Sequence, residues 1–249
     1  MNVGACSHDD RPSSSAVAKP ENNIIEYEFA FEDGTVESWK IDLERKLPVV
    51  SEKADLPDWT RLDYHQCENC PLKPDDVEHC PAAVDAIDIL ERFQSVFSYE
   101  TATITVRTIE RDFIKQTDLQ TALQSIIGLI MATSGCPILR QLKAMAHHHL
   151  PFSSPNETLY RTVSNHLLKL YLKRRRRGDD DDSRGEDEME SLLALYTELQ
   201  TVNGAFVKRI TKAAEKDANL NAIVLLFTIS ALVHASLEEG LEDLDALYS

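Results

Sequence analysis

Basic residues are scarce in this chain of 249 residues, which contains 26 Lys and Arg against 42 Asp and Glu and has a formal net charge of −16. Proteins that bind nucleic acids gain affinity from Lys and Arg side chains that neutralise phosphates. The charge balance therefore argues against a nucleic-acid partner. Hydrophobic residues make up 43% of the chain. That fraction is enough for a sizeable core, which excludes a wholly disordered protein.

Short catalytic motifs are also missing. The sequence contains no Gly-x-Ser-x-Gly nucleophile motif, no P-loop, no dinucleotide-binding glycine fingerprint and no His-Glu-x-x-His motif. These absences argue against an enzyme. A hydrolase or thiol redox enzyme stays open as a third interpretation, with His149 or the pair of Cys67 and Cys70 as the reactive groups.

Long apolar segments are few. Residues 1–23 contain no apolar stretch of signal-peptide length, so we expect a disordered tail and a cytoplasmic protein. Residues 220–237 carry no formal charge, but they include Asn221 and His234 and are flanked by acidic residues. A membrane span requires about 20 mainly apolar residues. We therefore expect a buried core helix at 220–237 and no membrane partner.

The negative charge is unevenly distributed. Residues 21–92 contain 19 acidic and 7 basic side chains, whereas residues 93–173 are mildly basic. Four arginines at 174–177 precede four aspartates at 179–182, and Gly178 between them interrupts the helical pattern. We expect a mobile charged loop over residues 174–188. The acidic surface supports an alternative function, that of a metal-free interaction or scaffold protein with an unknown protein partner.

The hydrophobic pattern predicts one hairpin followed mainly by helices. Apolar residues alternate in residues 24–43 around Asp33-Gly34, a pair that favours a tight primed turn. Residues 101–107 alternate again and predict a short strand. Helical spacing begins in residues 81–98 and continues after Thr117. We expect an α+β fold, a mainly helical body with a small N-terminal antiparallel β-hairpin layer.

This pattern also gives the expected domain organisation. Residues 24–80 should form the hairpin and a proline-rich, cysteine-bearing linker, and residues 81–249 the helical body. Together, residues 24–249 should form one unit. Within the body, Thr117 is the expected N-cap of one helix, another helix runs from Pro137 to the histidines, and Ser154 and Glu157 form a capping box.

Four of the five cysteines follow a positional logic. Cys67 and Cys70 form a Cys-x2-Cys pair, Cys80 follows after nine residues, and Cys136 lies far downstream. A proline follows both Cys80 and Cys136 where a helix should begin. The free N–H groups and the dipole of a helix N-terminus should lower the pKa of both thiols.

This cysteine pattern predicts a metal site. Thiols stay reduced in the cytoplasm, so clustered cysteines there favour metal or redox chemistry over structural disulfides. We predict that Cys67, Cys70, Cys80 and Cys136 bind zinc in tetrahedral geometry, with a regulatory or sensory role. An iron–sulfur cluster ranks second because no compact ferredoxin-type run of cysteines is present. A redox dithiol or disulfide and inert buried cysteines stay open as alternatives.

Several histidines are weaker candidates. His65 and His79 adjoin Cys67 and Cys80, so either could replace a cysteine ligand. Of the three consecutive histidines, His149 is the one expected to face the core. His166 shares a helix with Glu157, but the capping box already explains that carboxylate. Whether His149 or Glu157 has a role beyond packing and capping is left open.

Several short phrases together resemble an uncharacterised family of soluble bacterial proteins. They include Cys67–Leu72 (CENCPL), Ser134–Pro137 (SGCP) and His149–Phe152 (HLPF). The resemblance covers the chain from about residue 24. It implies a soluble bacterial protein, but it implies no activity and assigns no catalytic residue.

Overall fold

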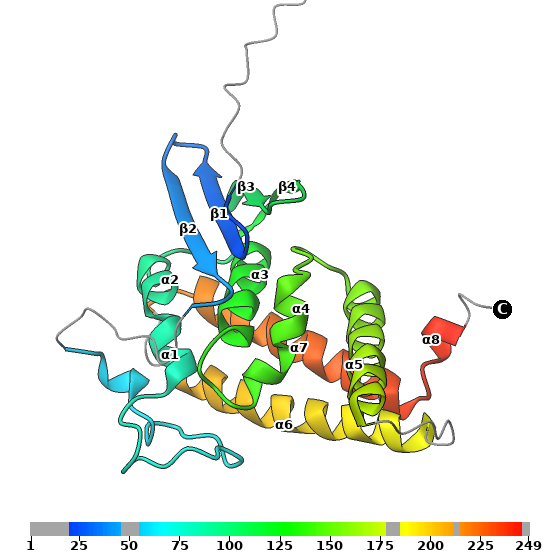
Figure 1. Cartoon of the computed structure of the whole chain (residues 1–249). Helices are drawn as coiled ribbons and strands as arrows, with labels where there is room; N and C mark the ends of the chain where they lie inside the picture. Colours follow the sequence, from blue (N-terminus) through cyan, green and yellow to red (C-terminus); the bar gives the residue numbers. More distant parts are fainter. Residues whose placement is uncertain (1–19, 46–54, 178–184, 212–214, 246–249) are drawn as a thin grey trace, which may run out of the picture.

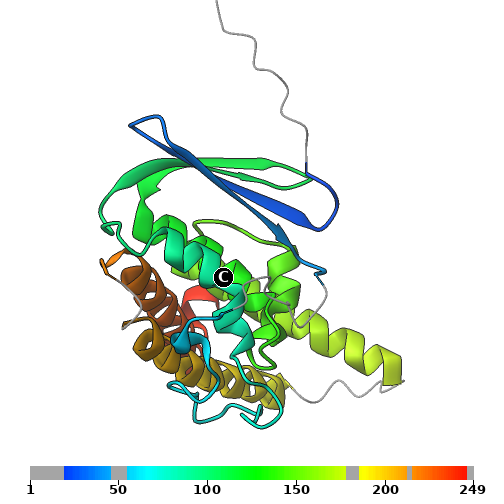
Figure 2. The same cartoon turned by 90° about the vertical axis from the view of Figure 1, so that its left-hand side faces the viewer.

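A four-stranded antiparallel sheet covers one side of a layer of helices (Figures 1 and 2). The computed structural model describes residues 20–45, 55–177, 185–211 and 215–245. The strands lie in the order β2-β1-β3-β4, and their bounds are β1 Ile24–Phe31, β2 Val36–Asp42, β3 Thr101–Arg107 and β4 Asp112–Asp118. The expected α+β fold with a mainly helical body is confirmed.

The sheet buries alternate residues of its two central strands. Tyr27 and Phe29 of β1 pair with Val106 and Ile104 of β3, and none of the four has exposed surface. Their side chains pack on the helices because alternate strand residues face the same side of a sheet. The hairpin and the strand at 101–107 were predicted from this alternation. Strand β4 was not, because its sequence is mostly polar and its Ile114 is 70% exposed.

The hairpin turn differs from the prediction. Phe31 and Thr35 close a three-residue loop, and Gly34 has a positive φ of 86°. The side chain of Asp33 accepts a hydrogen bond from the Thr35 N–H. Both kinds of primed two-residue turn need positive φ at the first central residue, and Asp33 does not have it, so the expected primed turn is wrong. Three-residue loops of this kind also place a glycine at the left-handed position.

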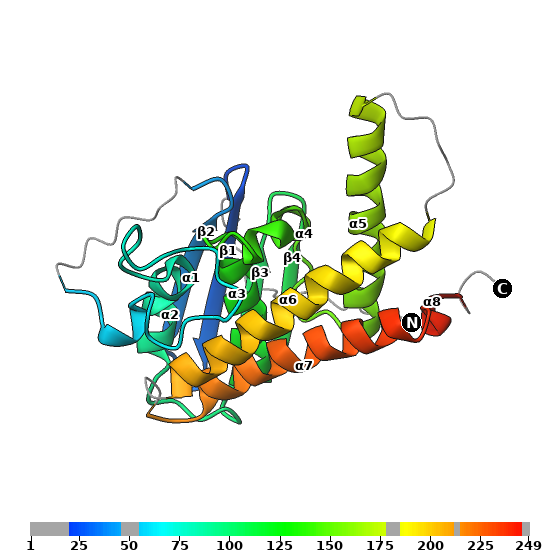
Figure 3. The same cartoon turned by 90° about the horizontal axis from the view of Figure 1, so that it is seen from below.

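The remaining regular elements of the described chain are helices. Their bounds are η1 Asp58–Thr60, α1 Pro81–Asp85, α2 Ile87–Arg92, α3 Leu119–Ala132, η2 Leu139–Leu142, α4 Lys143–His147, α5 Pro155–Arg177, α6 Gly185–Thr211, α7 Ala218–Glu238 and α8 Glu242–Asp245. Helix α3 lies between the sheet and α7, and α6 runs beside α7 (Figure 3).

Several helix boundaries correct the predictions. The N-cap of α3 is Asp118, whose carboxylate accepts from the Thr121 N–H, and not Thr117. The helix expected over residues 81–98 consists of α1 and α2, separated at Ala86. The helix expected from Pro137 is also divided, into η2 and α4. Apolar spacing alone does not register such breaks, because both pieces keep one face on the core.

The arginine run belongs to a helix. Helix α5 continues through Arg177, and Arg174 forms an ion pair of 2.7 Å with Glu188 of α6. Basic side chains are favourable in the last turn of a helix because they face the negative end of its dipole. The charged loop predicted over residues 174–188 is therefore too long. Residues 178–184 of that loop lie outside the described chain.

Helix α7 is long and apolar enough to cross a membrane by length and composition. In the structure it packs against α3, α5 and α6 (Figure 3). Its Ala222, Ile223 and Val233 are almost fully buried, whereas Val224 and Leu232 are exposed. The helix expected over residues 220–237 is therefore formed and packs in the helical body, but it is only partly buried, since 28% of its 18-residue apolar stretch is buried.

Candidate functional site

The four candidate cysteines lie on three segments that meet beside α6. Cys67 and Cys70 occupy the loop between η1 and α1, where the Cys70 N–H donates to the Cys67 carbonyl at 3.0 Å. Cys80 directly precedes α1, and its N–H donates to the Thr60 carbonyl at 2.7 Å. Cys136 follows the end of α3. All four are free thiols of intermediate burial.

Arg209 of α6 holds the cysteine-bearing loop in place. Arg209 is only 2% exposed, and its guanidinium donates to the carbonyls of Trp59 and Arg61 at 2.5 and 2.7 Å. A third donor reaches the carbonyl of Leu62 at 3.5 Å. Further along α6, the Glu198 carbonyl accepts from the Asn69 side chain at 3.1 Å. The loop is therefore fixed to α6 at two places, one before Cys67 and one between Cys67 and Cys70.

The thiols are close enough to influence one another. Burial, together with the nearby thiols of Cys80, Cys70 and Cys136, raises the pKa of Cys67 to about 12. The positive charge of Arg209 acts in the opposite direction on Cys67 and on Cys80. The structure thus brings all four predicted residues into one region, although Cys136 is 56 residues from the nearest of the others in sequence.

The predicted lowering of the thiol pKa values is wrong. The N–H groups of Ala82 and Ala83 do favour a Cys80 thiolate, and those of Ile138 and Leu139 favour a Cys136 thiolate. Burial nevertheless outweighs them and raises the pKa of both thiols. Neither cysteine has the acidic thiol typical of a reactive redox residue.

The thiols are not in metal-ligand positions in this structure. Within the described ranges, no group of three or more His, Cys, Asp or Glu side chains is arranged to hold a metal ion. Zinc ligation requires four donors at about 2.0–2.3 Å from one point. The grouping of the four cysteines in one region therefore agrees with the predicted metal site, but their sulfur atoms do not have the geometry of metal ligands in this structure.

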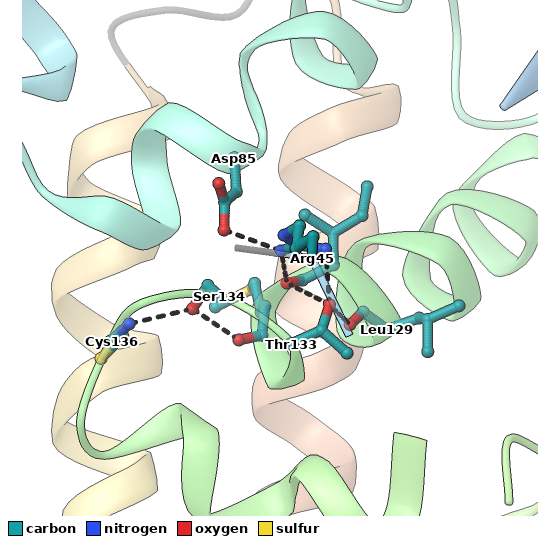
Figure 4. A network of polar contacts seen from close by, with 8 residues as sticks. Arg45, Asp85, Leu129, Thr133, Ser134 and Cys136 are labelled. Atoms are coloured by element: carbon teal, nitrogen blue, oxygen red, sulfur yellow. Dashed lines mark hydrogen bonds and ion pairs between the residues drawn. The ribbon is translucent and has the colours of Figure 1, made fainter. Parts of the chain in front are cut away.

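A buried ion pair connects the segments that carry Cys80 and Cys136. Arg45, just after β2, donates to the carboxylate of Asp85 in α1 at 2.7 Å and to Thr133 at 2.9 Å (Figure 4). The Ser134 hydroxyl then accepts from the Cys136 N–H at 3.3 Å. Burial raises the pKa of Asp85 although Arg45 lowers it. This network fixes the end of α3 relative to α1.

The histidines near the cysteines have other roles. Nδ1 of His79 is 2.8 Å from the Thr60 hydroxyl, and its Nε2 is 3.7 Å from Glu78. His65 has a positive φ of 47° and packs its ring edge on Tyr64. In the described chain, neither is part of a metal-ligand group.

Two further histidines join helices. Nε2 of His166 in α5 is 2.9 Å from the Ser191 hydroxyl of α6. Nε2 of His234 in α7 is 3.1 Å from the Thr197 hydroxyl of α6. The Glu157 carboxylate, on the same helix as His166, accepts from the Ser154 N–H, so the predicted capping box is formed.

His149 faces the core, as predicted. Its Nε2 lies 2.5 Å from the Tyr27 hydroxyl, which also contacts the Ser125 hydroxyl at 2.7 Å. Although the residue keeps some exposed surface, burial of the ring, together with the positive charge of Arg161, lowers the pKa of His149 to about 3. Tyr27 thus stands between His149 and Ser125, so the two do not form a nucleophile–base pair of the kind that a hydrolase requires.

Arg209 and Arg45 are the site residues that sequence reasoning missed. Arg209 did give a signal, because it lies on the apolar face of its helix, three residues after Phe206 and seven after Val202. A charged residue at such a position needs buried partners. Arg45 gave no such signal, since it follows a strand and finds its partners 40 and more residues away.

A family model described as a domain of unknown function (DUF6901) matches residues 25–249. The expectation of an uncharacterised family that covers the chain from about residue 24 is therefore confirmed. No curated protein and no solved structure matches the chain.

Proposed function

Because the chain belongs to the DUF6901 family, a domain of unknown function, we propose a function from its own residues. The protein binds a soft metal ion through Cys67, Cys70, Cys80 and Cys136. Zinc is the preferred ion and an iron–sulfur cluster ranks second. The bound metal has a structural or sensory role, and the protein acts in the cytoplasm.

The convergence of the four cysteines supports this proposal most strongly. Cys67, Cys70 and Cys80 lie between η1 and α1, and Cys136 lies after α3, yet each of the other three thiols raises the pKa of Cys67. A packing role would not require a Cys-x2-Cys pair to meet two further cysteines. Four thiolates in one place are the ligand set that zinc and iron–sulfur clusters prefer.

Metal binding also explains why positively charged groups surround the cysteines. Four adjacent thiolates repel one another, so they stay protonated unless cations offset their charge. Arg209 supplies one positive charge, and the N–H groups near Cys80 and Cys136 supply partial positive charge. A divalent ion would supply the rest. Ligation requires the sulfurs to approach one another, and the Cys67–Cys70 segment lies in a loop without regular secondary structure beyond turns.

The thiol pKa values favour metal binding over thiol redox catalysis. Redox-active cysteines react as thiolates, which requires a low pKa. Burial instead raises the pKa of Cys67, Cys80 and Cys136. Bound metal deprotonates a coordinating thiol outright, so a raised pKa in the metal-free state does not prevent ligation.

The test is a metal analysis of protein purified without oxygen, by mass spectrometry together with a visible spectrum. We expect about one zinc ion per chain and no colour, whereas an iron–sulfur cluster would absorb visible light. Cys67→Ser and Cys136→Ser should each reduce the metal content well below that of the wild type. A chelator should lower the melting temperature, because binding to the folded state alone stabilises it.

Cys6→Ser is the matched control, because Cys6 lies outside residues 25–249 and should leave the metal content unchanged. Colourless protein with far less than one metal ion per chain would contradict both versions of the proposal. That result would favour the metal-free interaction protein instead.

A further inference from the structure

A cavity of about 180 Å³ lies between the helices of the body, and no cysteine is among its lining residues. Helices α3, α6 and α7 form much of its wall, and η2, α4 and the start of α5 complete it. Most of the lining is apolar, with Leu129, Leu142, Leu199, Leu226 and Ile229 among its residues. An apolar cavity of about 150 Å³ is already large enough to admit benzene. The space is therefore sufficient for one small aromatic molecule.

One polar group in this wall has no partner. Ser230 of α7 is only 7% exposed, and its hydroxyl makes no hydrogen bond in the structure. Leaving a buried hydroxyl unpaired costs free energy, so a native protein usually gives it a partner. Asn203 of α6 is also buried and lines the same cavity. The two residues give one part of an otherwise apolar wall a capacity for hydrogen bonds.

A positive charge lies in another part of the wall. Arg161 of α5 donates from one nitrogen, Nη2, to the carbonyls of Met145 and His148 at 3.1 and 2.7 Å. Among the described residues no carboxylate lies within ion-pair distance of its guanidinium, although Glu157 is one turn away. Burial lowers the pKa of Arg161. A carboxylate in the cavity would give this charge a partner with matching geometry.

We propose that this cavity binds a small carboxylic acid with an apolar, preferably aromatic, body and a hydroxyl group at its far end. The carboxylate pairs with Arg161. The body packs against the leucines and Ile229, and the hydroxyl group bonds to Ser230 and Asn203. This inference is independent of the cysteine site, so either proposal can fail without the other.

Three related compounds test each contact by calorimetric titration of the full chain at neutral pH. The probes are 4-hydroxyphenylacetate, phenylacetate, which lacks the hydroxyl, and 4-hydroxyphenylethanol, which lacks the charge. We expect one 4-hydroxyphenylacetate per chain. Phenylacetate should bind about five-fold more weakly, since one hydrogen bond contributes about 1 kcal/mol. The neutral alcohol should bind at least about ten-fold more weakly, because a hydrogen bond to a charged group is worth more.

Substitutions in the cavity wall show which residue causes each difference in affinity between the three compounds. Ser230→Ala should abolish the preference for 4-hydroxyphenylacetate over phenylacetate. Thr228→Ala, an exposed position two residues away on the same helix, should preserve it. Arg161→Met should abolish the preference for the acid over the alcohol. If that variant fails to fold, the comparison of the two probes on the wild type still tests the charge.

A filling substitution tests the cavity itself. Ser230→Val adds bulk and removes the unpaired hydroxyl, so it should raise the melting temperature and weaken binding of all three compounds at least about ten-fold. Absence of binding by every probe would overturn the proposal. So would equal binding of the three compounds, or equal losses in Ser230→Ala and Thr228→Ala.

Discussion

At the scale of single residues, the contact between His149 and Tyr27 joins the sheet to the helical body. The hydroxyl of Tyr27 in β1 meets Nε2 of His149, which follows α4, and Ser125 of α3. Burial raises the pKa of Tyr27 and lowers that of His149, so both side chains stay uncharged at neutral pH. The contact is a neutral hydrogen-bond network, which suits a structural role.

This network predicts how stability depends on pH. The pKa of His149 falls from 6.5 in the unfolded chain to about 3 in the folded protein. Between these values the unfolded chain binds a proton that the folded protein does not, so acidification favours unfolding. We expect a loss of about 1–2 kcal/mol between pH 6.5 and pH 5, at about 1.4 kcal/mol per pH unit when fully expressed. Urea unfolding at several pH values measures it.

A variant isolates the contribution of His149. His149→Gln keeps a neutral polar side chain without a titrating group, so its stability should fall less than that of the wild type over the same pH range. His148→Gln changes an exposed neighbour and should behave like the wild type. Identical pH dependence in the wild type and in His149→Gln would contradict a buried neutral histidine.

At the scale of elements, the Arg45 network sets the relative positions of β2, α1 and α3. The side chain of Asp85 is only 4% exposed and that of Arg45 is 19% exposed, so the pair is largely removed from water. Arg45 also donates to the Ile130 carbonyl at 3.2 Å near the end of α3. The cysteines at the start of α1 and after α3 depend on this arrangement for their relative positions.

A double-mutant cycle tests this connection. Arg45→Met leaves the buried Asp85 carboxylate without its partner and should cost about 3 kcal/mol of the free energy of unfolding. The double variant Arg45→Met and Asp85→Leu should lose clearly less than the sum of the two single variants. Additive losses would show that the pair is not coupled. The exposed pair of Lys143 and Glu44 is the control and should show little coupling.

Element types were predictable where local chemistry determines them. The capping box of Ser154 and Glu157 identified the start of α5, because these two residues satisfy each other's backbone N–H groups. Strand β4 was missed because only its pairing with β3 makes it a strand, and its own residues are mostly polar. Likewise, the predicted end of α5 lies too early in the chain. Residues 174–177 are helical because they continue the helix that precedes them, and the arginine run alone does not indicate this.

At the scale of the whole molecule, the sequence predicted which cysteines to group but not what surrounds them. Spacing connected Cys67, Cys70 and Cys80, and the proline after Cys136 suggested the fourth. The buried charge of Arg209 and the net effect of burial on the thiols depend on tertiary packing between α6 and the loop. The spacing of the cysteines contains no information on how deeply they are buried, so the predicted direction of the thiol pKa shift was wrong.

The cavity is likewise a property of the whole molecule. Its lining residues come from α3, η2, α4, α5, α6, α7 and the connecting segment after α4. No single sequence motif could therefore predict the cavity. Ser230 gave no signal in the sequence, because a serine in an apolar helix often bonds to its own backbone. Only the folded structure shows that this hydroxyl has no partner.

X-ray absorption at the zinc edge tests the proposed metal site most directly, because it counts the ligand atoms around the ion. The measurement uses protein purified without oxygen. The variant Cys6→Ser is measured in the same way as a control. We predict four sulfur ligands at about 2.3 Å in the wild type and in that control. Cys136→Ser should show fewer sulfur ligands. Zinc bound only by nitrogen and oxygen, or no zinc at all, would contradict a four-cysteine zinc site.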